Sequence, residues 1–261
     1  MEVKTRAAVL YEMGAKKPYK ESKPLKIEYL ELDDSSEHEV LIKIHAAGLC
    51  HSDLSVINGN RPRPLPMALG HEASGEVIKV GKAVTRVSEG DHVVCTFIPS
   101  CGKCIPCKEG RPALCENGAI SNEKGEMLEG GVRLSNDEGK VYHHLGISGF
   151  AEYSVVSENS IVKIDKKIPF ERAAAFGCAI ITGIGAVVNT AQIRSGSNVA
   201  VVGLGGIGLN AIIGAKLAGA NEIIALDINE DKFELAKQFG ATATFNSSDK
   251  DIRSEERRVG K

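Results

Sequence analysis

The stretch N-V-A-V-V-G-L-G-G-I-G occupies residues 198–208 and decides the fold of the C-terminal part of the chain. Its first residues form a nearly continuous apolar run, which is typical of a strand covered on both faces of a parallel sheet. A glycine-rich G-x-G-x-x-G pattern follows, with glycines at Gly203, Gly205, Gly206 and Gly208. This order predicts a strand, a tight turn and then a helix to about residue 218. It favours a doubly wound parallel α/β sheet.

A second strand is predicted over residues 222–226, ending at Asp227, and a second helix over residues 231–239. In such a unit the glycines let the backbone approach a pyrophosphate, and the helix N-terminus offers it free N–H groups. Asp227 lies where a carboxylate can accept hydrogen bonds from the adenosine ribose and repel a 2′-phosphate. The sequence therefore predicts an incomplete Rossmann domain that binds NAD. The alternative is a glycine-rich turn in an unrelated α/β fold.

The N-terminal part reads as short strands separated by turns, the clearest over residues 7–10, 40–44, 75–80 and 92–95. This density of strands predicts a barrel-like β domain. The polar, glycine-rich segment over residues 116–148 is predicted to be a long loop, and residues 170–192 a helical run. We expect a β domain over residues 1–180 and a nucleotide-binding domain over residues 181–252.

Four cysteines with the spacing C-x2-C-x2-C-x7-C fall between residues 95 and 120, namely Cys101, Cys104, Cys107 and Cys115. This pattern predicts a tetrahedral Cys₄ zinc site. Because thiolates fill all four positions, no substrate can bind there, and the metal is expected to hold the lobe together.

Composition excludes several classes of protein. The 261 residues carry 32 basic and 34 acidic side chains, a net charge of −2, so no basic surplus argues for a nucleic-acid partner. Residues 173–193 contain no charge, and we interpret them as a buried helix because glycine and polar residues make a membrane span too weak. The N-terminus has no signal-peptide core, so a cytoplasmic protein is expected. Its cysteines are then thiolates or metal ligands, and Cys95 is expected in the core.

The chain resembles the medium-chain, zinc-dependent alcohol dehydrogenases from about residue 7 to about residue 246. Five motifs carry the resemblance, namely G-L-C-H-S-D at 48–53, G-H-E-A-S-G at 70–75, the cysteine quartet, Gly177-Cys178 with Thr182-Gly183, and the glycine-rich turn with Asp227. This family combines a GroES-like β-barrel catalytic domain with a Rossmann domain. The segment after Cys115 is similar to the longer branch, which includes the liver-type and glutathione-dependent formaldehyde dehydrogenases.

The resemblance implies that Cys50, His71 and Cys178 bind a catalytic zinc, a Cys₂His set already established for alcohol dehydrogenases. Two zinc ions per chain are then expected. Spacing alone joins none of these residues, and singly Cys178 is typical of a small core residue and His71 of a structural histidine. The resemblance further implies that Asp53 orients His71 and that Glu72 approaches the metal during ligand exchange.

The family pattern also assigns a proton path and contacts to the cofactor. Ser52 is expected to accept the alcohol proton, and His51 to lie at the pyrophosphate. Many liver-type members carry a histidine three residues after this serine, where this chain has Ser55. Thr182 is expected against the nicotinamide and Lys232 beside Asp227 at the ribose, although a solvated helix lysine is the alternative there.

We therefore predict hydride transfer between a primary, secondary or aromatic alcohol and NAD, giving the aldehyde or ketone. Phe97 matches an aromatic wall of the substrate pocket, with ordinary core packing as the alternative. Formaldehyde dehydrogenases place an arginine where this chain has Ala119, which disfavours a glutathione adduct. S-(hydroxymethyl)glutathione dehydrogenase is the alternative activity. Other rivals are a non-catalytic zinc and nucleotide-binding protein and a zinc-free quinone reductase.

The resemblance ends at about residue 246, whereas members of the family continue well beyond the length of this chain. We expect a C-terminally truncated chain in which residues 253–261 are a non-native tail. The whole protein is expected to be a homodimer or homotetramer, with no nucleic-acid or membrane partner.

Overall fold

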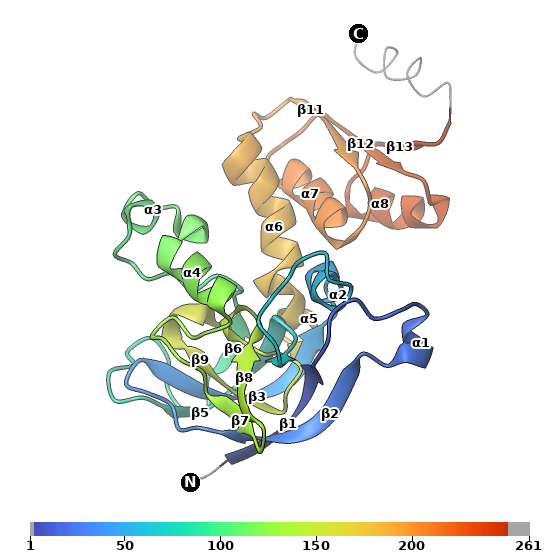
Figure 1. The fold of residues 1–261 in the computed structure, drawn as a ribbon. Coiled ribbons are helices and arrows are strands. Elements are labelled where there is room, and N and C mark those ends of the chain that lie inside the picture. The colour runs from blue at the N-terminus through green and yellow to red at the C-terminus, as the bar shows by residue number, and fades with distance from the viewer. Residues whose placement is uncertain (1–2, 250–261) are drawn as a thin grey trace. The chain divides into compact units, whose positions relative to one another are not determined.

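The structure is a computed structural model that describes residues 3–249, so the predicted tail over residues 253–261 lies outside the described residues. The chain divides into two compact units, and the boundary between them along the sequence falls between Cys178 and Ala179 (Figure 1). The functional assignment of residues 1–180 and 181–252 stays a prediction.

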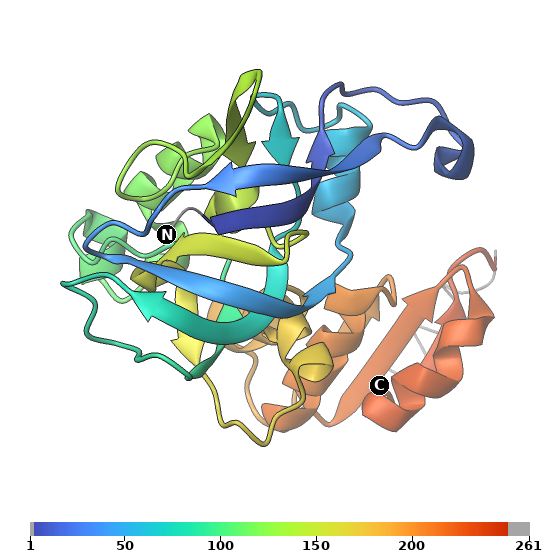
Figure 2. The same ribbon diagram turned by 90° about the horizontal axis from the view of Figure 1, so that it is seen from below.

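A closed barrel and a five-stranded sheet form the N-terminal unit (Figure 2). The barrel has the order β1-β2-β7-β8-β4, with β1 at Val3–Leu10, β2 at Leu25–Leu32, β4 at Met67–Ala68, β7 at Leu134–Asn136 and β8 at Gly139–His143. The sheet has the order β10-β6-β5-β3-β9, with β3 at Glu39–Gly48, β5 at Glu72–Val80, β6 at His92–Cys95, β9 at Tyr153–Ser157 and β10 at Ile161–Lys163. The four strands predicted here are confirmed, as is the β-barrel architecture.

Short helices connect these strands. They are α1 at Tyr19–Ser22, α2 at His51–Ile57, α3 at Ile105–Lys108, α4 at Glu116–Lys124, α5 at Phe170–Ala173, and the 3₁₀ turns η1 at Pro112–Leu114, η2 at His144–Gly146, η3 at Glu158–Ser160 and η4 at Ala174–Gly177. Helix α2 starts directly after Cys50 and lies between β3 and β4 along the chain, so it links one sheet to the other.

The long loop predicted over residues 116–148 is wrong. The segment holds α4 and the β7–β8 hairpin, whose strands pair antiparallel from Leu134 with Val141 to Asn136 with Gly139. The sulfur of Cys115 accepts a hydrogen bond from the backbone of Gly118 at the start of α4. Helix α4 escaped prediction because its sequence, E-N-G-A-I-S-N-E-K, has no apolar stripe.

The C-terminal unit contains a parallel sheet of order β11-β12-β13, with β11 at Asn198–Val202, β12 at Glu222–Asp227 and β13 at Ala243–Asn246. The glycine-rich turn leads from β11 into α7 at Gly206–Leu217, and η6 at Glu230–Lys232 precedes α8 at Phe233–Phe239. Ile212, Ile223 and Ala236 are fully or nearly fully buried between the helices and the sheet. The predicted doubly wound arrangement is confirmed, and β13 adds a strand that was not predicted.

The helical run predicted over residues 170–192 is helical but not continuous. It consists of α5, η4, α6 at Ala179–Gly185 and the π-helical η5 at Ala186–Ala191. Cys178 leaves the helical conformation, with φ −141° and ψ −78°, and this breaks the run. Several apolar side chains in it are also exposed, so the single buried helix predicted over residues 173–193 is wrong.

Within residues 3–249, no single helix is both long and apolar enough to cross a membrane. The segments Phe170–Gly177 and Ala179–Ala191 reach the required length and composition only when they are taken together as a bent pair.

A close approach of α6 to α7 yields a first prediction. A methyl group at Gly183 would collide with the carbonyl of Ile207 and lie 2.6 Å from Cβ of Asn210, whereas one at Gly185 would meet only ordinary contacts. We expect Gly183→Ala to lower the free energy of unfolding by about 1–3 kcal/mol through overpacking. Gly185→Ala, two residues away in the same helix, should raise it by up to about 1 kcal/mol. Urea denaturation measures both, and equal effects would contradict the packing argument.

Candidate functional site

Cys50 lies between the end of strand β3 and the start of helix α2. Cys50 precedes the first residue of α2 in an extended conformation, and its backbone N–H donates to Oδ2 of Asp53 at 3.1 Å. Asp53 is thus fixed one turn into the helix with its carboxylate folded back over the helix start. This local geometry follows from the sequence C-H-S-D itself.

Gly70 places His71 behind this helix. The backbone of Gly70 has φ +91°, and a side chain there would lie within 2.6 Å of the Phe150 ring. Only glycine fits this turn. The imidazole of His71 is 1% exposed, and its Nδ1 lies 3.2 Å from Oδ1 of Asp53. Its ring is therefore held edge-on by the carboxylate, with the opposite nitrogen directed away from Asp53.

Cys178 reaches the same place because the chain before it passes very close to β6. A methyl group at Gly177 would overlap the carbonyl oxygen of Cys95, so the backbone there requires glycine. The ligand atoms of Cys50, His71, Glu72 and Cys178 all lie within 4.8 Å of one another. The structure thus brings together three residues that spacing could not join, and Glu72 with them.

The charges of this cluster favour a cation. Cys178 and His71 hold the pKa of the Cys50 thiol at about 3, whereas Cys50 and burial raise the pKa of Cys178. Burial lowers the pKa of His71, but Asp53 and Cys50 outweigh it and raise this pKa to about 9. Burial and repulsion by Cys50 raise the pKa of Glu72. The negative charge on Cys50 thus disfavours ionisation of Cys178 and Glu72. A divalent cation would offset this repulsion.

His144 belongs to the same neighbourhood and was not predicted. Its Nδ1 lies 3.0 Å from Oδ1 of Asp53, and its ring is perpendicular to that of His71 with centroids 5.3 Å apart. Burial raises the pKa of Asp53, but His144 and His71 outweigh it and keep that pKa below its ordinary value. No local pattern marks His144, since its partner is on another element far along the chain.

The remaining residues predicted near the metal lie around α2 and β6. The hydroxyl of Ser52 is 3.7 Å from the sulfur of Cys50. His51 is exposed, and the Ser55 hydroxyl donates to its carbonyl at 2.9 Å while lying 3.3 Å from its ring Nδ1. The ring of Phe97 packs edge-on to His71 with centroids 6.3 Å apart. Cys95 is fully buried in the core, as expected.

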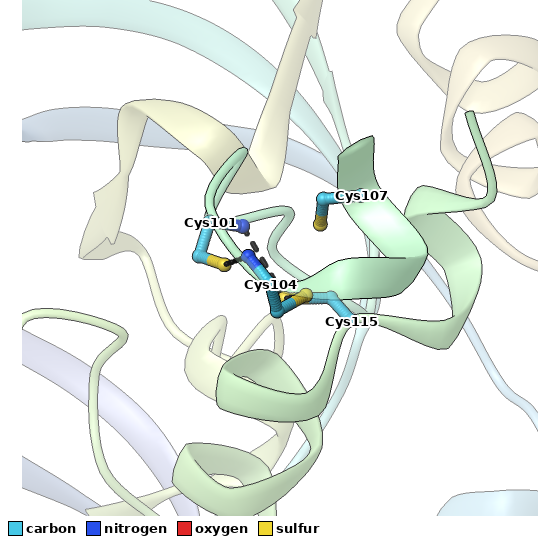
Figure 3. Close-up of side chains that lie close together, drawn as sticks. All are labelled: Cys101, Cys104, Cys107 and Cys115. Carbon is cyan, nitrogen blue, oxygen red and sulfur yellow. Dashed lines mark hydrogen bonds between the residues drawn. The ribbon is translucent and has the colours of Figure 1, made fainter. Parts of the chain in front are cut away.

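The cysteine quartet forms a second, separate cluster. The sulfurs of Cys101, Cys104, Cys107 and Cys115 lie within 4.8 Å of one another (Figure 3). Backbone N–H groups point at them, since Lys103 donates to Cys101 at 3.4 Å and Gly118 to Cys115 at 3.3 Å. Such donors stabilise negative sulfur, so this donor set fits a thiolate-bound metal.

The glycine-rich turn has open space on one side and a close contact on the other. Methyl groups placed on Gly203, which has φ +90°, or on Gly205 would meet no atom within 4 Å. One placed on Gly208 would overlap the carbonyl of Gly203, so α7 packs directly on the turn. The turn can therefore admit a phosphate next to the N-terminus of α7, which begins at Gly206.

Asp227 closes this turn from the end of β12. Its oxygens accept from the backbone of Leu204 at 2.6 Å and of Asn229 at 2.8 Å, and Nζ of Lys232 lies 2.9 Å away. These donors hold the pKa of Asp227 at about 2. Thr182 lies half-buried on α6 in the same unit.

Comparison with known proteins places these features in a family context. Residues 36–166 match the family model described as alcohol dehydrogenase GroES-like domain, and residues 206–260 the one described as zinc-binding dehydrogenase. The S-(hydroxymethyl)glutathione dehydrogenase of Synechocystis sp. is 44% identical over 250 residues, which cover 95% of this chain and 66% of the relative. The chain thus spans just under two thirds of that protein.

Two solved structures show the same fold. An alcohol dehydrogenase zinc-binding domain protein from Burkholderia ambifaria has a TM-score of 0.90 at 37% identity, over 99% of this chain and 68% of that one. A benzyl alcohol dehydrogenase from Acinetobacter calcoaceticus has a TM-score of 0.88 at 38% identity, over 98% of this chain and 67% of that one.

The low pKa of Asp227 yields a second prediction. Because this pKa is about 2 and that of an unfolded aspartate about 3.9, the ionised carboxylate stabilises the fold above pH ~4. That contribution is lost as the pH falls toward about 2. Asp227→Asn should therefore lower the free energy of unfolding at pH 6, and the difference from the unmodified protein should narrow on acidification. Urea denaturation from pH 6 downward measures this, with the exposed Asp231→Asn as control. A difference independent of pH would contradict it.

Proposed function

This chain belongs to the zinc-dependent alcohol dehydrogenase family, and we propose that the whole protein is an NAD-dependent alcohol dehydrogenase. It interconverts a primary, secondary or aromatic alcohol and the corresponding aldehyde or ketone. The observation that carries the proposal is the convergence of the half-buried Cys50 with the buried His71 and Cys178 in one cluster. A non-catalytic protein that binds zinc and a nucleotide would not require three zinc ligands that leave the fourth coordination position for a substrate.

The donor set of this cluster fits zinc. Two sulfurs and one imidazole nitrogen are preferred zinc ligands, and two thiolates with a neutral imidazole cancel the charge of Zn²⁺. When bound, the zinc supplies Lewis-acid chemistry that lowers the pKa of an alcohol, and NAD supplies the hydride acceptor. Asp53 keeps the proton on Nδ1 of His71, which leaves the other nitrogen free to act as a ligand. Glu72 lies within reach of the same position and assists exchange of the fourth ligand.

The proton of the alcohol leaves by way of Ser52. Its hydroxyl lies beside Cys50, which supports a place next to the reacting group. Beyond it, Ser55 is occupied by its hydrogen bond to the carbonyl of His51 and cannot titrate near neutral pH. We infer that the last step of the proton path runs to solvent or buffer, with His51 kept for the pyrophosphate of the cofactor.

The C-terminal unit binds the adenosine half of NAD. Gly203 and Gly205 leave room for the pyrophosphate beside Gly206 at the start of α7, and Gly208 brings the helix close enough for its N–H groups to reach it. Among the residues that the structure describes, Oδ1 of Asp227 accepts from Asn229 alone and so retains one lone pair for a ribose hydroxyl. Lys232, which is already paired with Asp227, contributes to the contact with the ribose. Thr182 is assigned to the nicotinamide side.

The cysteine quartet binds a second zinc with a structural role. Four thiolates leave no position for a substrate, and the lobe between β6 and β7 contains only the short helices α3, η1 and α4. The expected homodimer or homotetramer and the cytoplasmic location stay predictions.

The substrate is proposed to be a simple or aromatic alcohol. Ala119 lies exposed on α4, where a methyl group offers nothing to bind a carboxylate. The similarity to the benzyl alcohol dehydrogenase supports this choice. The second candidate is S-(hydroxymethyl)glutathione, favoured by the 44% identity with the Synechocystis sp. enzyme.

Metal content tests the proposed function directly. We expect the whole protein to hold two zinc ions per chain and to produce NADH from NAD and a primary alcohol, followed by absorbance. Cys50→Ser should lose one zinc and all NADH formation, because the catalytic cluster loses a ligand. Cys95→Ala, which changes a buried cysteine outside both clusters, should keep both zinc ions. A single zinc in the unmodified protein, without NADH from any alcohol, would refute the assignment.

A second experiment separates the two substrates. The unmodified protein should have a higher kcat/KM for benzyl alcohol than for S-(hydroxymethyl)glutathione. Ala119→Arg should raise kcat/KM for the glutathione adduct about tenfold, in line with the worth of a charge-assisted contact, and leave benzyl alcohol unchanged. Ala119→Gln controls for side-chain length without the charge. A preference of the unmodified protein for the glutathione adduct would make the second candidate the correct one.

A further inference from the structure

His144 is a buried imidazole without an assigned role. It is fully buried, with Nδ1 3.0 Å from Oδ1 of Asp53 and Nε2 without a hydrogen-bond partner among residues 3–249. The N–H direction departs from that of a linear hydrogen bond, so the contact with Asp53 is a short electrostatic one. A carboxylate oxygen at this distance requires the proton on Nδ1.

The turn that carries His144 is held in an uncommon backbone conformation. Leu145 and Ser148 have φ +54° and +55°, a region that residues other than glycine rarely adopt. The neighbouring His143 anchors the turn, because its Nε2 accepts from the backbone of Arg133 at 3.0 Å and its Nδ1 lies 3.1 Å from the Ser148 hydroxyl. Strained backbone of this kind persists where the surroundings fix it, and it is concentrated at functional sites.

Asp53 connects this turn to the metal cluster. Its Oδ2 accepts from the backbone of Cys50, and its Oδ1 from the backbone of Gly70 at 3.1 Å and from His71. Rotation of the carboxylate would therefore displace the ring of His71 and the backbone of Cys50, both proposed metal ligands. The contact from His144 restrains that rotation from a third side.

The two imidazoles also contact each other. The ring of His144 stands at 89° to that of His71, and Phe97 packs edge-on to His71 as well, at 80°. The packing against His144 and Phe97 and the contact with Asp53 thus restrain the same motion, rotation of the His71 ring about Cβ–Cγ.

We propose that His144 is a positioning residue of the catalytic metal site, which acts by holding the Asp53 carboxylate in the orientation that directs His71 toward Cys50 and Cys178. This inference rests on the proposed function, because it concerns the same zinc. His144 is not among the residues whose ligand atoms gather around Cys50, His71 and Cys178, so its effect is on the affinity and symmetry of the site.

Two amide variants test the proposal with Zn²⁺ and Co²⁺ as probes. The amide nitrogen of Asn takes the place of Nδ1 and that of Gln the place of Nε2, so only His144→Asn keeps the donor facing Asp53. We expect His144→Gln to weaken metal affinity at the Cys50–His71–Cys178 site about tenfold and to shift the visible Co²⁺ bands of that site. His144→Asn should stay within about threefold of the unmodified protein.

Competition with a chelator gives both affinities, and Cys50→Ser and Cys104→Ser variants assign each to its cluster. The cysteine quartet serves as the internal control and should keep its affinity in both amide variants. Equal behaviour of the two amide variants, or a joint loss at both metal sites, would overturn the positioning role. If the unmodified protein bound no metal at Cys50, His71 and Cys178, the proposed function would fail, and this inference with it.

Discussion

The carboxylate of Asp53 is the constraint on which the reactive cluster depends. It receives the backbone N–H groups of Cys50 and Gly70 and the imidazole of His71. A buried carboxylate is costly unless it is fully hydrogen-bonded, and here the partners that satisfy it are two proposed metal ligands and the turn between them. The folding requirement and the functional requirement are thus met by one group. The hydrogen bonds of Asp53 thus fix the positions of two proposed ligands.

The third proposed ligand, Cys178, is placed differently, by a close backbone contact. Gly177 passes so near the carbonyl of Cys95 that no side chain fits there, and Cys178 then leaves the helical conformation. The break in the predicted helix is therefore the feature that turns the Cys178 thiol to the cluster. The side chain of Cys95 is fully buried in the hydrophobic core of the five-stranded sheet. Its carbonyl, and not its thiol, takes part in building the site.

Local sequence patterns predicted what is local in the structure. The quartet and the glycine-rich turn are each contained in one short segment, so spacing and residue type suffice to identify them. Cys50, His71 and Cys178 were joined only by family resemblance, since their grouping depends on packing across distant segments. His144 could not be found, because only the folded chain brings it to Asp53. Helix α4 was missed because it is short and polar and follows no hydrophobic period.

The two cysteine-containing clusters differ in what must form first. The quartet spans fifteen residues from Cys101 to Cys115, so a metal can gather it without the barrel, and its binding free energy is available to order the lobe. The other cluster draws on α2, on the turn before β5 and on the residue after η4. Metal can bind there only after the N-terminal unit has packed. On the proposed assignment, metal binding at the quartet contributes to folding, whereas the residues of the other cluster are placed by hydrogen bonds and close backbone contacts. A zinc ion held by Cys50, His71 and Cys178 would keep its fourth position for substrate, because hydrogen bonds and backbone contacts hold these three residues in place without a fourth protein ligand.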